Sequence, residues 1–407
     1  MKYMSKEIGG VGCVFVPMDD INSTTVLVLA KAGSIYETRE TNGISHFLEH
    51  LFFKGGKKYK NPKEVAEAID SFGGEFNAFT GDEYAGYYVK SSPEFVNKSI
   101  DVLGDMMTNA CFPEEEMQRE KGVVIQEIMM YQDNPVALVM DKWKEFYFGD
   151  NSYGWSTLGP KENVESFTRE DLIKHKNNLY TKDNLILIIS GKIEDQGKIE
   201  KDIETKFADI PSKRSMKKPK YLDILPDKKF DLFDKKTEQN HLIISAKGFD
   251  GNDEQKYAAN VLATILGGNM SSRLFQNIRE KEGLCYYIKA SHHSDVDSGV
   301  FLIRAGLEKG RFDFGVKKIF EELEKIANGD INQDEFAKAI GYNIGQLQMG
   351  IESSDEMANF VGTQQLLYDK IKTLDEILDI YKNIKIEDVI KVAEKLKKEN
   401  LYHYWIQ

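Results

Sequence analysis

Between positions 43 and 53, apolar residues recur with the period of an α-helix. The sequence there is Gly-Ile-Ser-His-Phe-Leu-Glu-His-Leu-Phe-Phe, and its apolar positions follow the spacing i, i+3, i+4, i+7, i+8. Such a stripe predicts a helix that docks on a core through one face. Asn42 can cap its start, and the glycines at 55 and 56 can end it.

The opposite face of this helix carries His46, Glu49 and His50 together, because successive residues turn by about 100°. Two histidines one turn apart can bind one zinc ion through neutral ring nitrogens. Glu49 directly precedes His50 and cannot easily be a third ligand. It can reach a zinc-bound water and act as a general base. The alternative is a chance trio on a solvated surface.

A second helix offers a third ligand. Its predicted start is Pro113 with three acids after it, and it ends before Asn134. Glu120 and Glu127 are seven residues apart and so share one face. Glu127 lies among apolar residues, where a buried carboxylate would need a partner such as a metal ion. The alternative is an ordinary solvated glutamate.

The remaining pattern predicts the same order of elements twice. In the first half we expect strands at 11–16, 24–30, 75–80, 83–91 and 184–191, and helices at 61–72 and 93–110. In the second half we expect strands at 242–247 and 299–305, and helices at 312–327 and 332–349. Aligning Ile331 with Phe112 places Gln346 opposite Glu127. No second His-x-x-Glu-His occurs, so the second half is interpreted as a duplicate that lost its metal ligands.

A segment rich in proline and basic residues separates the halves. It contains Pro211, Pro219 and Pro226 with little apolar periodicity, which is typical of an exposed domain boundary. We therefore predict a zinc-binding domain at 1–208, a linker at 209–229 and a degenerate duplicate at 230–407.

Composition narrows the classes of protein. The chain has 407 residues, 41% of them hydrophobic, and a formal net charge of −12. The negative charge argues against nucleic-acid binding. No apolar run approaches the ~20 residues that span a bilayer, and no signal peptide is expected at the N-terminus. The three cysteines Cys13, Cys111 and Cys285 show no paired spacing, so we expect reduced thiols and a cytoplasmic protein.

The motifs together resemble a known family. His-x-x-Glu-His at 46–50, with Glu127 lying 77 positions after His50, is similar to the inverted zinc motif of the pitrilysin/insulysin peptidases, the inverzincins of peptidase family M16. The segments 73–80, 166–172, 180–185 and 272–286 also resemble this family. The similarity covers nearly the whole chain. It is greatest to the short bacterial chains related to the mitochondrial processing peptidase.

The resemblance implies a fold and an activity. The fold is α+β, with two homologous domains that each have a mainly antiparallel sheet and helices packed on one side. The activity is that of a zinc metalloendopeptidase that cleaves unfolded peptides inside a closed chamber. One Zn²⁺ per chain is held by His46, His50 and Glu127, and Glu49 activates the zinc-bound water. Glu120 is implied to be a catalytic group that orients the water or a ligand.

The resemblance also implies residues that bind substrate. Arg279 and Tyr286, carried by the second half, hydrogen-bond the substrate carbonyl and the developing oxyanion. Asn77 and Ala78 lie on an edge strand where an extended peptide adds as a further strand.

The implied partners are a peptide substrate and a second subunit. A homodimer is expected, and a heterodimer with a paralogous subunit is the alternative. Neither nucleic acid nor membrane is an expected partner. A rival hypothesis is a non-catalytic subunit that acts as a peptide-binding scaffold. A protein with purely structural zinc is a third, but it would need a fourth protein ligand.

Overall fold

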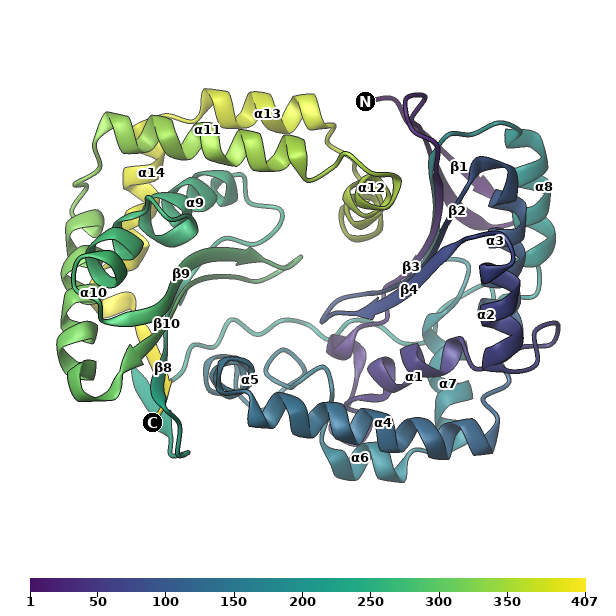
Figure 1. The fold of residues 1–407 in the computed structure, drawn as a ribbon, viewed down its shortest axis with the longest axis horizontal. Coiled ribbons are helices and arrows are strands. Elements are labelled where there is room, and N and C mark those ends of the chain that lie inside the picture. Colours follow the sequence, from purple (N-terminus) through teal and green to yellow (C-terminus); the bar gives the residue numbers. More distant parts are fainter. The chain divides into compact units, whose positions relative to one another are not determined.

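Six strands of the first half form one sheet in the order β1-β2-β6-β3-β5-β4 (Figure 1). The computed structural model describes residues 1–407. The strands are β1 (Met4–Ile8), β2 (Val11–Pro17), β3 (Thr24–Ala30), β4 (Glu75–Thr80), β5 (Ala85–Ser91) and β6 (Leu185–Gly191). β3 and β6 are buried along their whole length, as the continuous apolar run at 184–191 predicts. β1 was not predicted.

Five strands of the second half form a sheet in the order β7-β11-β8-β10-β9. They are β7 (Phe230–Phe233), β8 (Gln239–Lys247), β9 (Cys285–Ser294), β10 (Gly299–Glu308) and β11 (Tyr402–Ile406). This order repeats β2-β6-β3-β5-β4 of the first sheet, strand for strand. In each sheet the first two strands of that series run parallel and the other pairs run antiparallel. The predicted α+β fold with two homologous domains is confirmed.

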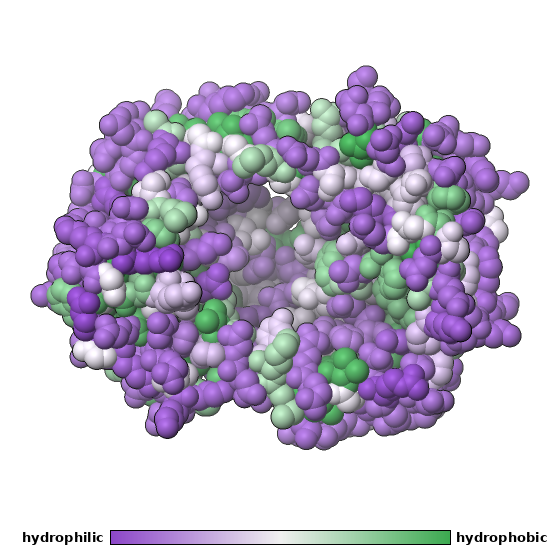
Figure 2. Space-filling view, in the orientation of Figure 1, coloured by the Kyte–Doolittle hydropathy of each residue, from purple (hydrophilic) through white to green (hydrophobic).

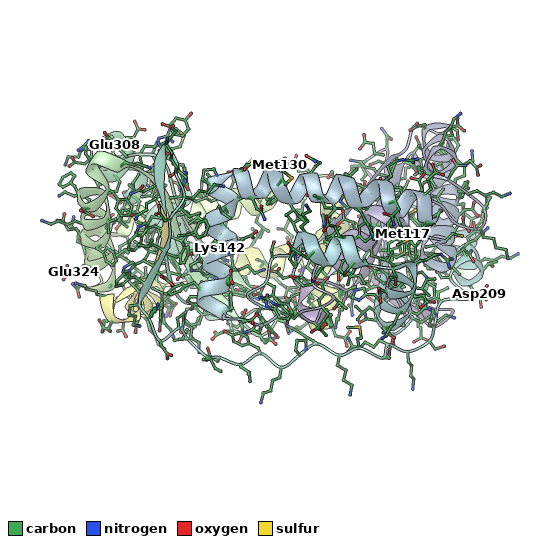
Figure 3. The ribbon with its side chains drawn as sticks, turned by 90° about the horizontal axis from the view of Figure 1, so that it is seen from below. Met117, Met130, Lys142, Asp209, Glu308 and Glu324 are labelled. Atoms are coloured by element: carbon green, nitrogen blue, oxygen red, sulfur yellow. The ribbon has the colours of Figure 1, made fainter.

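Helices surround both sheets. Those of the first half are α1 (Ile44–Phe52), α2 (Pro62–Asp70), α3 (Val96–Asn109), α4 (Glu114–Asp133), α5 (Pro135–Phe148), α6 (Lys161–Ser166), α7 (Arg169–Leu179) and α8 (Gln196–Lys206). Those of the second half are α9 (Gln255–Ala263), α10 (Phe312–Ala327), α11 (Gln333–Met349), α12 (Ser354–Tyr368), α13 (Leu374–Asn383) and α14 (Ile386–Ala393). α10 has the bounds that the sequence predicted. Figure 3 shows α4 as one uninterrupted helix that carries Met117 and Met130.

One helix from each half packs on the sheet of the other half. Ser354 of α12 lies 2.8 Å from Thr25 on β3, between hydroxyl oxygens. Ser99 of α3 contacts Ser91, whose strand partner is Thr24, and adjacent strand residues face opposite ways. α3 and α12 therefore cover opposite faces of the first sheet. The predicted helices on one side come from the same half, and the exchanged helix adds a layer on the other side.

In the same manner, α5 of the first half packs on the second sheet. The indole nitrogen of Trp143 donates a hydrogen bond of 3.0 Å to the hydroxyl of Ser245 on β8. Leu138, Val139 and Tyr147 join a buried cluster with apolar residues of β8, β10 and β11. Each sheet is thus closed by a helix that lies far away in sequence.

The compact units follow this exchange. Unit 1 comprises Met1–Met129, Trp155–Lys220 and Gly350–Lys372, and unit 2 comprises Met130–Gly154, Tyr221–Met349 and Thr373–Gln407. They differ from the halves predicted at 1–208 and 230–407 because each unit includes a helix of the other half. The predicted linker at 209–229 has no helix or strand, and one unit boundary falls within it.

The face of the molecule that is drawn in Figure 2 is mostly polar. Figure 2 shows hydrophilic residues over much of the visible face, with apolar residues in scattered groups. None of the helices combines the length and apolar character that crossing a membrane requires.

Candidate metal centre

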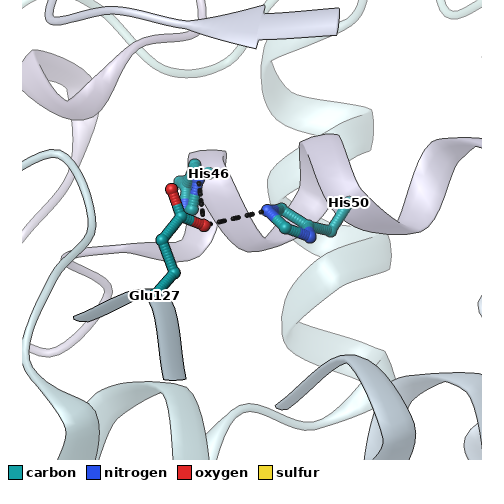
Figure 4. Close-up of side chains that lie close together, drawn as sticks. All are labelled: His46, His50 and Glu127. Carbon is teal, nitrogen blue, oxygen red and sulfur yellow. Dashed lines mark ion pairs between the residues drawn. The ribbon is translucent and has the colours of Figure 1, made fainter. Parts of the chain in front are cut away.

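Three side chains from two helices of unit 1 converge on one point. The Nε2 atoms of His46 and His50, on α1, lie 3.6 and 3.5 Å from Oε2 of Glu127, on α4 (Figure 4). The ligand atoms of the three side chains all lie within 4.8 Å of one another. The structure therefore brings together the three predicted metal ligands, although Glu127 lies 77 residues or more from either histidine in the sequence.

The spacing of these atoms suits zinc. Ligand atoms at about 2.0–2.1 Å from a tetrahedral zinc ion are roughly 3.3 Å apart, close to the 3.6 and 3.5 Å between Glu127 Oε2 and the two imidazole nitrogens. Two imidazoles and one carboxylate would hold a zinc ion with three protein ligands and so would leave a fourth position open, as catalytic zinc sites require. The three side chains are 10%, 20% and 27% exposed, so the centre is partly accessible. The ring nitrogen of His46 that faces away from Glu127, Nδ1, is buried without a hydrogen-bond partner.

The pKa values of the two histidines are shifted in opposite directions. Burial, with a smaller contribution from His50, lowers the pKa of His46 to about 3, so its ring is neutral as a ligand must be. Burial also acts to lower the pKa of His50. The carboxylates of Glu120, Glu49 and Glu127 outweigh this effect, and the pKa of His50 is raised.

Glu120 holds the far side of the His50 ring. Its Oε2 lies 3.3 Å from His50 Nδ1, and its Oε1 lies 2.8 Å from the Nζ of Lys54. Burial acts to raise the pKa of Glu120, but hydrogen bonds from His50 and Lys54 prevail and lower it. The sequence led us to expect Glu127 as the buried acid of α4. The structure shows instead that Glu120 is buried, with 7% of its side chain exposed against 27% for Glu127. Lys54 was not predicted.

Glu49 is held by a residue of β4. The hydroxyl of Thr80 donates a hydrogen bond of 2.5 Å to Oε2 of Glu49. Burial raises the pKa of Glu49, and Thr80 and His50 oppose part of that rise. Thr80 belongs to the segment that resembles the family, but no local pattern marks it as a partner of Glu49.

The start of α1 differs from the prediction. The N-cap residue is Gly43, at φ 97°, and no side chain at the cap position binds the helix. The carboxylate of Glu37 takes that role, because it accepts hydrogen bonds from the backbone N–H groups of Gly43 and Ser45. Asn42, which we expected as the cap, donates its side-chain amide to Glu37 instead.

Asn77 and Ala78 lie on an open sheet edge, as predicted. β4 is the last strand of its sheet and pairs only with β5. The backbone N–H of Ala78 donates to Oδ1 of Asn77 at 2.9 Å, so this N–H is covered by a side chain of its own strand. A peptide that added here would have to displace the Asn77 amide to reach it.

Arg279 and Tyr286 belong to unit 2. Tyr286 is on β9, the edge strand of the second sheet, and is 77% exposed. Its neighbour Tyr287 instead contacts Nδ1 of His241 at 3.1 Å. The guanidinium carbon of Arg279 lies 4.6 Å from the ring centroid of Phe275. Arg279 and Tyr286, the two residues of unit 2 that are predicted to bind substrate, are thus at the surface of that unit.

Taken together, the duplicated α+β fold and the inverted His-x-x-Glu-His helix define a zinc peptidase architecture. The description "Insulinase (Peptidase family M16)" matches residues 16–161, and "Peptidase M16 inactive domain" matches residues 166–342. The chain belongs to peptidase family M16. The second match covers most of the half in which no metal-ligand cluster occurs.

Relatives from several bacteria align over nearly the whole chain. "Uncharacterized zinc protease YmxG" of Bacillus subtilis (strain 168) is 36% identical over 394 residues, which cover 96% of this chain and 94% of that protein. An "Uncharacterized zinc protease" of Rickettsia bellii is 35% identical, with coverages of 97% and 94%. The crystal structure of a protease from Helicobacter pylori has the same fold, with a TM-score of 0.91 at 24% identity and coverages of 100% and 99%.

Proposed function

We propose that this protein is a zinc-dependent endopeptidase that cleaves unfolded peptides or small polypeptides within a closed chamber. The observation that carries the proposal is the convergence of His46, His50 and Glu127, with Glu49 beside them on the helix turn between the histidines. The zinc protease names of the relatives support it. The alternative, a non-catalytic scaffold subunit, would be favoured by the loss of any of these four side chains, and all four are present.

The chemistry that zinc supplies at such a centre is Lewis-acid activation of water and of the scissile carbonyl. His46, His50 and Glu127 would hold the ion, and Glu120 would fix the orientation of the His50 ring. Glu49 would take the proton from the attacking water and then transfer it to the leaving amine. Thr80 fixes one oxygen of Glu49 and leaves the other free for this transfer.

Substrate binding is proposed to use both sheet edges that carry predicted residues. The β4 edge at Asn77 and Ala78 would pair with an extended peptide through main-chain hydrogen bonds, which tolerate varied side chains. Arg279 and Tyr286 would donate hydrogen bonds to the oxyanion that forms during attack. The high exposure of Tyr286 leaves its hydroxyl available for this role.

Hydrolysis of a fluorogenic unfolded peptide tests the proposal. We expect the zinc-loaded protein to cleave it, a chelator to stop cleavage, and added zinc to restore it. Glu49→Gln should retain zinc but lose about 100-fold or more of the rate, because general acid–base catalysis contributes ~10²–10⁴. Turnover near that of the wild type in this variant would remove Glu49 from the role of base. A fully zinc-loaded wild type that binds the peptide without cleaving it would favour the scaffold alternative.

We further propose a homodimer in which Arg279 and Tyr286 of one subunit complete the metal centre of the other. The support is that the metal centre lies in unit 1 and the Arg/Tyr pair in unit 2 of the same chain. Mixing Glu49→Gln subunits with Tyr286→Phe subunits tests this arrangement. If the sites are shared, one site of each heterodimer is intact, and activity returns towards half of that of the wild type. If both groups act within one subunit, no activity returns.

A further inference from the structure

One buried acid of unit 1 has no basic partner. Glu37 is 5% exposed, and no lysine, arginine or histidine forms an ion pair with it. Its three hydrogen-bond donors all come from the start of α1. Oε2 accepts from the N–H of Gly43 at 2.9 Å and from the side-chain amide of Asn42 at 3.0 Å, and Oε1 accepts from the N–H of Ser45 at 2.8 Å.

These contacts place a carboxylate where a helix most favours one. The first N–H groups of a helix have no partner within it, and the helix dipole adds positive potential there. Gly43 occupies the cap position and has no side chain to offer. A Cβ at Gly43 would lie 2.6 Å from the carbonyl oxygen of Leu158, so a larger capping residue is excluded. Glu37 therefore replaces the missing cap from six residues upstream.

From this geometry we propose that Glu37 is a positioning residue for the metal centre. It anchors the first turn of α1 and so fixes where His46, the third residue of that nine-residue helix, meets Glu127. A first turn that frays would move His46 before it moved His50, because His50 lies one turn further along. This inference rests on the metal site of the proposed function, although it does not require that the protein cleave peptides.

The hydrogen bonds from the helix terminus offset part of the cost of burying the Glu37 carboxylate. Burial raises the pKa of Glu37 to about 7, and the hydrogen bonds from Asn42, Ser45 and Gly43 oppose part of that rise. Asn42 is itself fixed, because its amide also donates to the carbonyl oxygen of Ser156 at 2.9 Å. The acceptor and its donors thus form a set with defined positions.

The test is Glu37→Gln, with zinc affinity measured by competition with a chromogenic chelator. The variant replaces one acceptor oxygen by an NH₂ group that faces a backbone N–H. We expect zinc to bind at least tenfold more weakly, and the visible spectrum of the Co²⁺-substituted protein to change because the ligand geometry changes.

Asp105→Asn is the matched control. Asp105 is another buried carboxylate of unit 1. It accepts from the N–H groups of Lys58 and Tyr59 at 3.0 and 3.1 Å and from the amide of Asn109 at 3.0 Å, but it binds no residue of α1. This variant should lower the melting temperature comparably and leave the zinc affinity and the Co²⁺ spectrum unchanged.

The inference is overturned if Glu37→Gln binds zinc with wild-type affinity and an unchanged Co²⁺ spectrum, even if its melting temperature falls. If that variant does not fold, Asn42→Ala removes a single donor to the carboxylate and should weaken zinc binding several-fold. An unchanged affinity there would equally overturn it. A wild type that binds zinc but hydrolyses nothing would reject the proposed function alone.

Discussion

The two sheets share one strand order, yet the helices that follow their third strands in that order, β3 and β8, differ completely in chemistry. α1 presents His46, Glu49 and His50 beside a carboxylate of α4. The first helix after β8 is α9, which contains no histidine or acid, and six of its nine residues are buried. In α11, the counterpart of α4, Gln346 stands where alignment expects Glu127 and is exposed.

This difference shows which part of the domain carries the fold and which the chemistry. Strand order depends on apolar residues facing the core, and these are retained in both halves. The predicted metal ligands, His46 and His50 on α1 and Glu127 on α4, are separate from the apolar positions that fill that core. A duplicated domain can therefore replace them without losing its sheet, and an apolar α9 is a further way to fill the same position.

The largest effect is expected when the corresponding side chains of the two halves, Glu127 and Gln346, are each replaced by the other. Glu127→Gln is expected to lower zinc affinity by more than about 100-fold, beyond the 10–100-fold typical of losing an outer-shell partner. Gln346→Glu should leave the metal content at one zinc per chain. Zinc content is measured after dialysis of the purified variants. Full occupancy in Glu127→Gln would mean that another residue is the third ligand.

The helices behind α1 and α9 allow a second test, through pH. His175 of α7 lies behind α1, where its Nε2 is 3.0 Å from the hydroxyl of Ser45, whereas α14, which packs on α9, has no histidine. Burial lowers the pKa of His175 to about 4. Since the ordinary value is higher, the unfolded chain binds more protons between about pH 6.5 and 4, and stability falls as the pH falls through that range.

The full loss amounts to about 3 kcal/mol, at 1.36 kcal/mol per pKa unit. His175→Gln should therefore show a flatter decline of melting temperature between pH 7 and pH 4 than the wild type, with both proteins measured free of metal. Parallel pH profiles would show that His175 does not contribute to acid sensitivity.

The smallest expected effect is on the free energy of unfolding and concerns the exchanged helix α12. Two helical glycines, one in α12 and one in α11, make a matched pair for this test. A Cβ on Gly362 of α12 would lie 2.6 Å from Cδ1 of Ile188 and 2.8 Å from Cδ1 of Leu29, in the core of the first sheet. Gly341 of α11 has no atom within 4 Å of the same position. Gly362→Ala should destabilise by about 1 kcal/mol, the cost of overpacking less the gain in helix propensity. Gly341→Ala should stabilise by about 0.5–1 kcal/mol.

Chemical denaturation of the two variants measures both effects. Two shifts of the same sign would contradict the tight packing of α12 on the sheet. A stabilising effect at Gly362 in particular would show that Ile188 and Leu29 can move aside at little cost.

Local patterns were sufficient for much of the fold and for selecting the three predicted ligands that converge in the structure. The histidines of α1 are one turn apart, and Glu127 lies on a helix whose acidic start and whose end before Asn134 can both be predicted from the sequence. What escaped prediction depends on contacts distant in sequence. Thr80 meets Glu49 across 31 residues, only because β4 packs beside α1. Glu37 precedes its helix by more than any capping pattern spans.

One omission had a visible local signal. The sequence pattern predicts that a helix ends before Asn134 and Pro135, which is correct, but these two residues also begin α5. The side chain of Asn134 caps its first turn, and Pro135 occupies the first helical position. The destination of α5, the sheet of the other half, has no such signal, because an apolar helix face does not identify the surface it will cover.

The exchange of α5 and α12 between the halves has a consequence for folding while the chain is being synthesised. When β6 leaves the ribosome, every strand of the first sheet has been synthesised, but the helix that covers Leu29 and Ile188 has not. That apolar face stays uncovered until residue 368 at the end of α12 has emerged. The nascent N-terminal half therefore stays incompletely folded, with an apolar sheet face exposed, until almost the whole polypeptide has been synthesised. A chaperone that binds apolar strands would find its target in this interval, and a ribosome that stalls between β6 and α12 would release a product unable to finish its first domain.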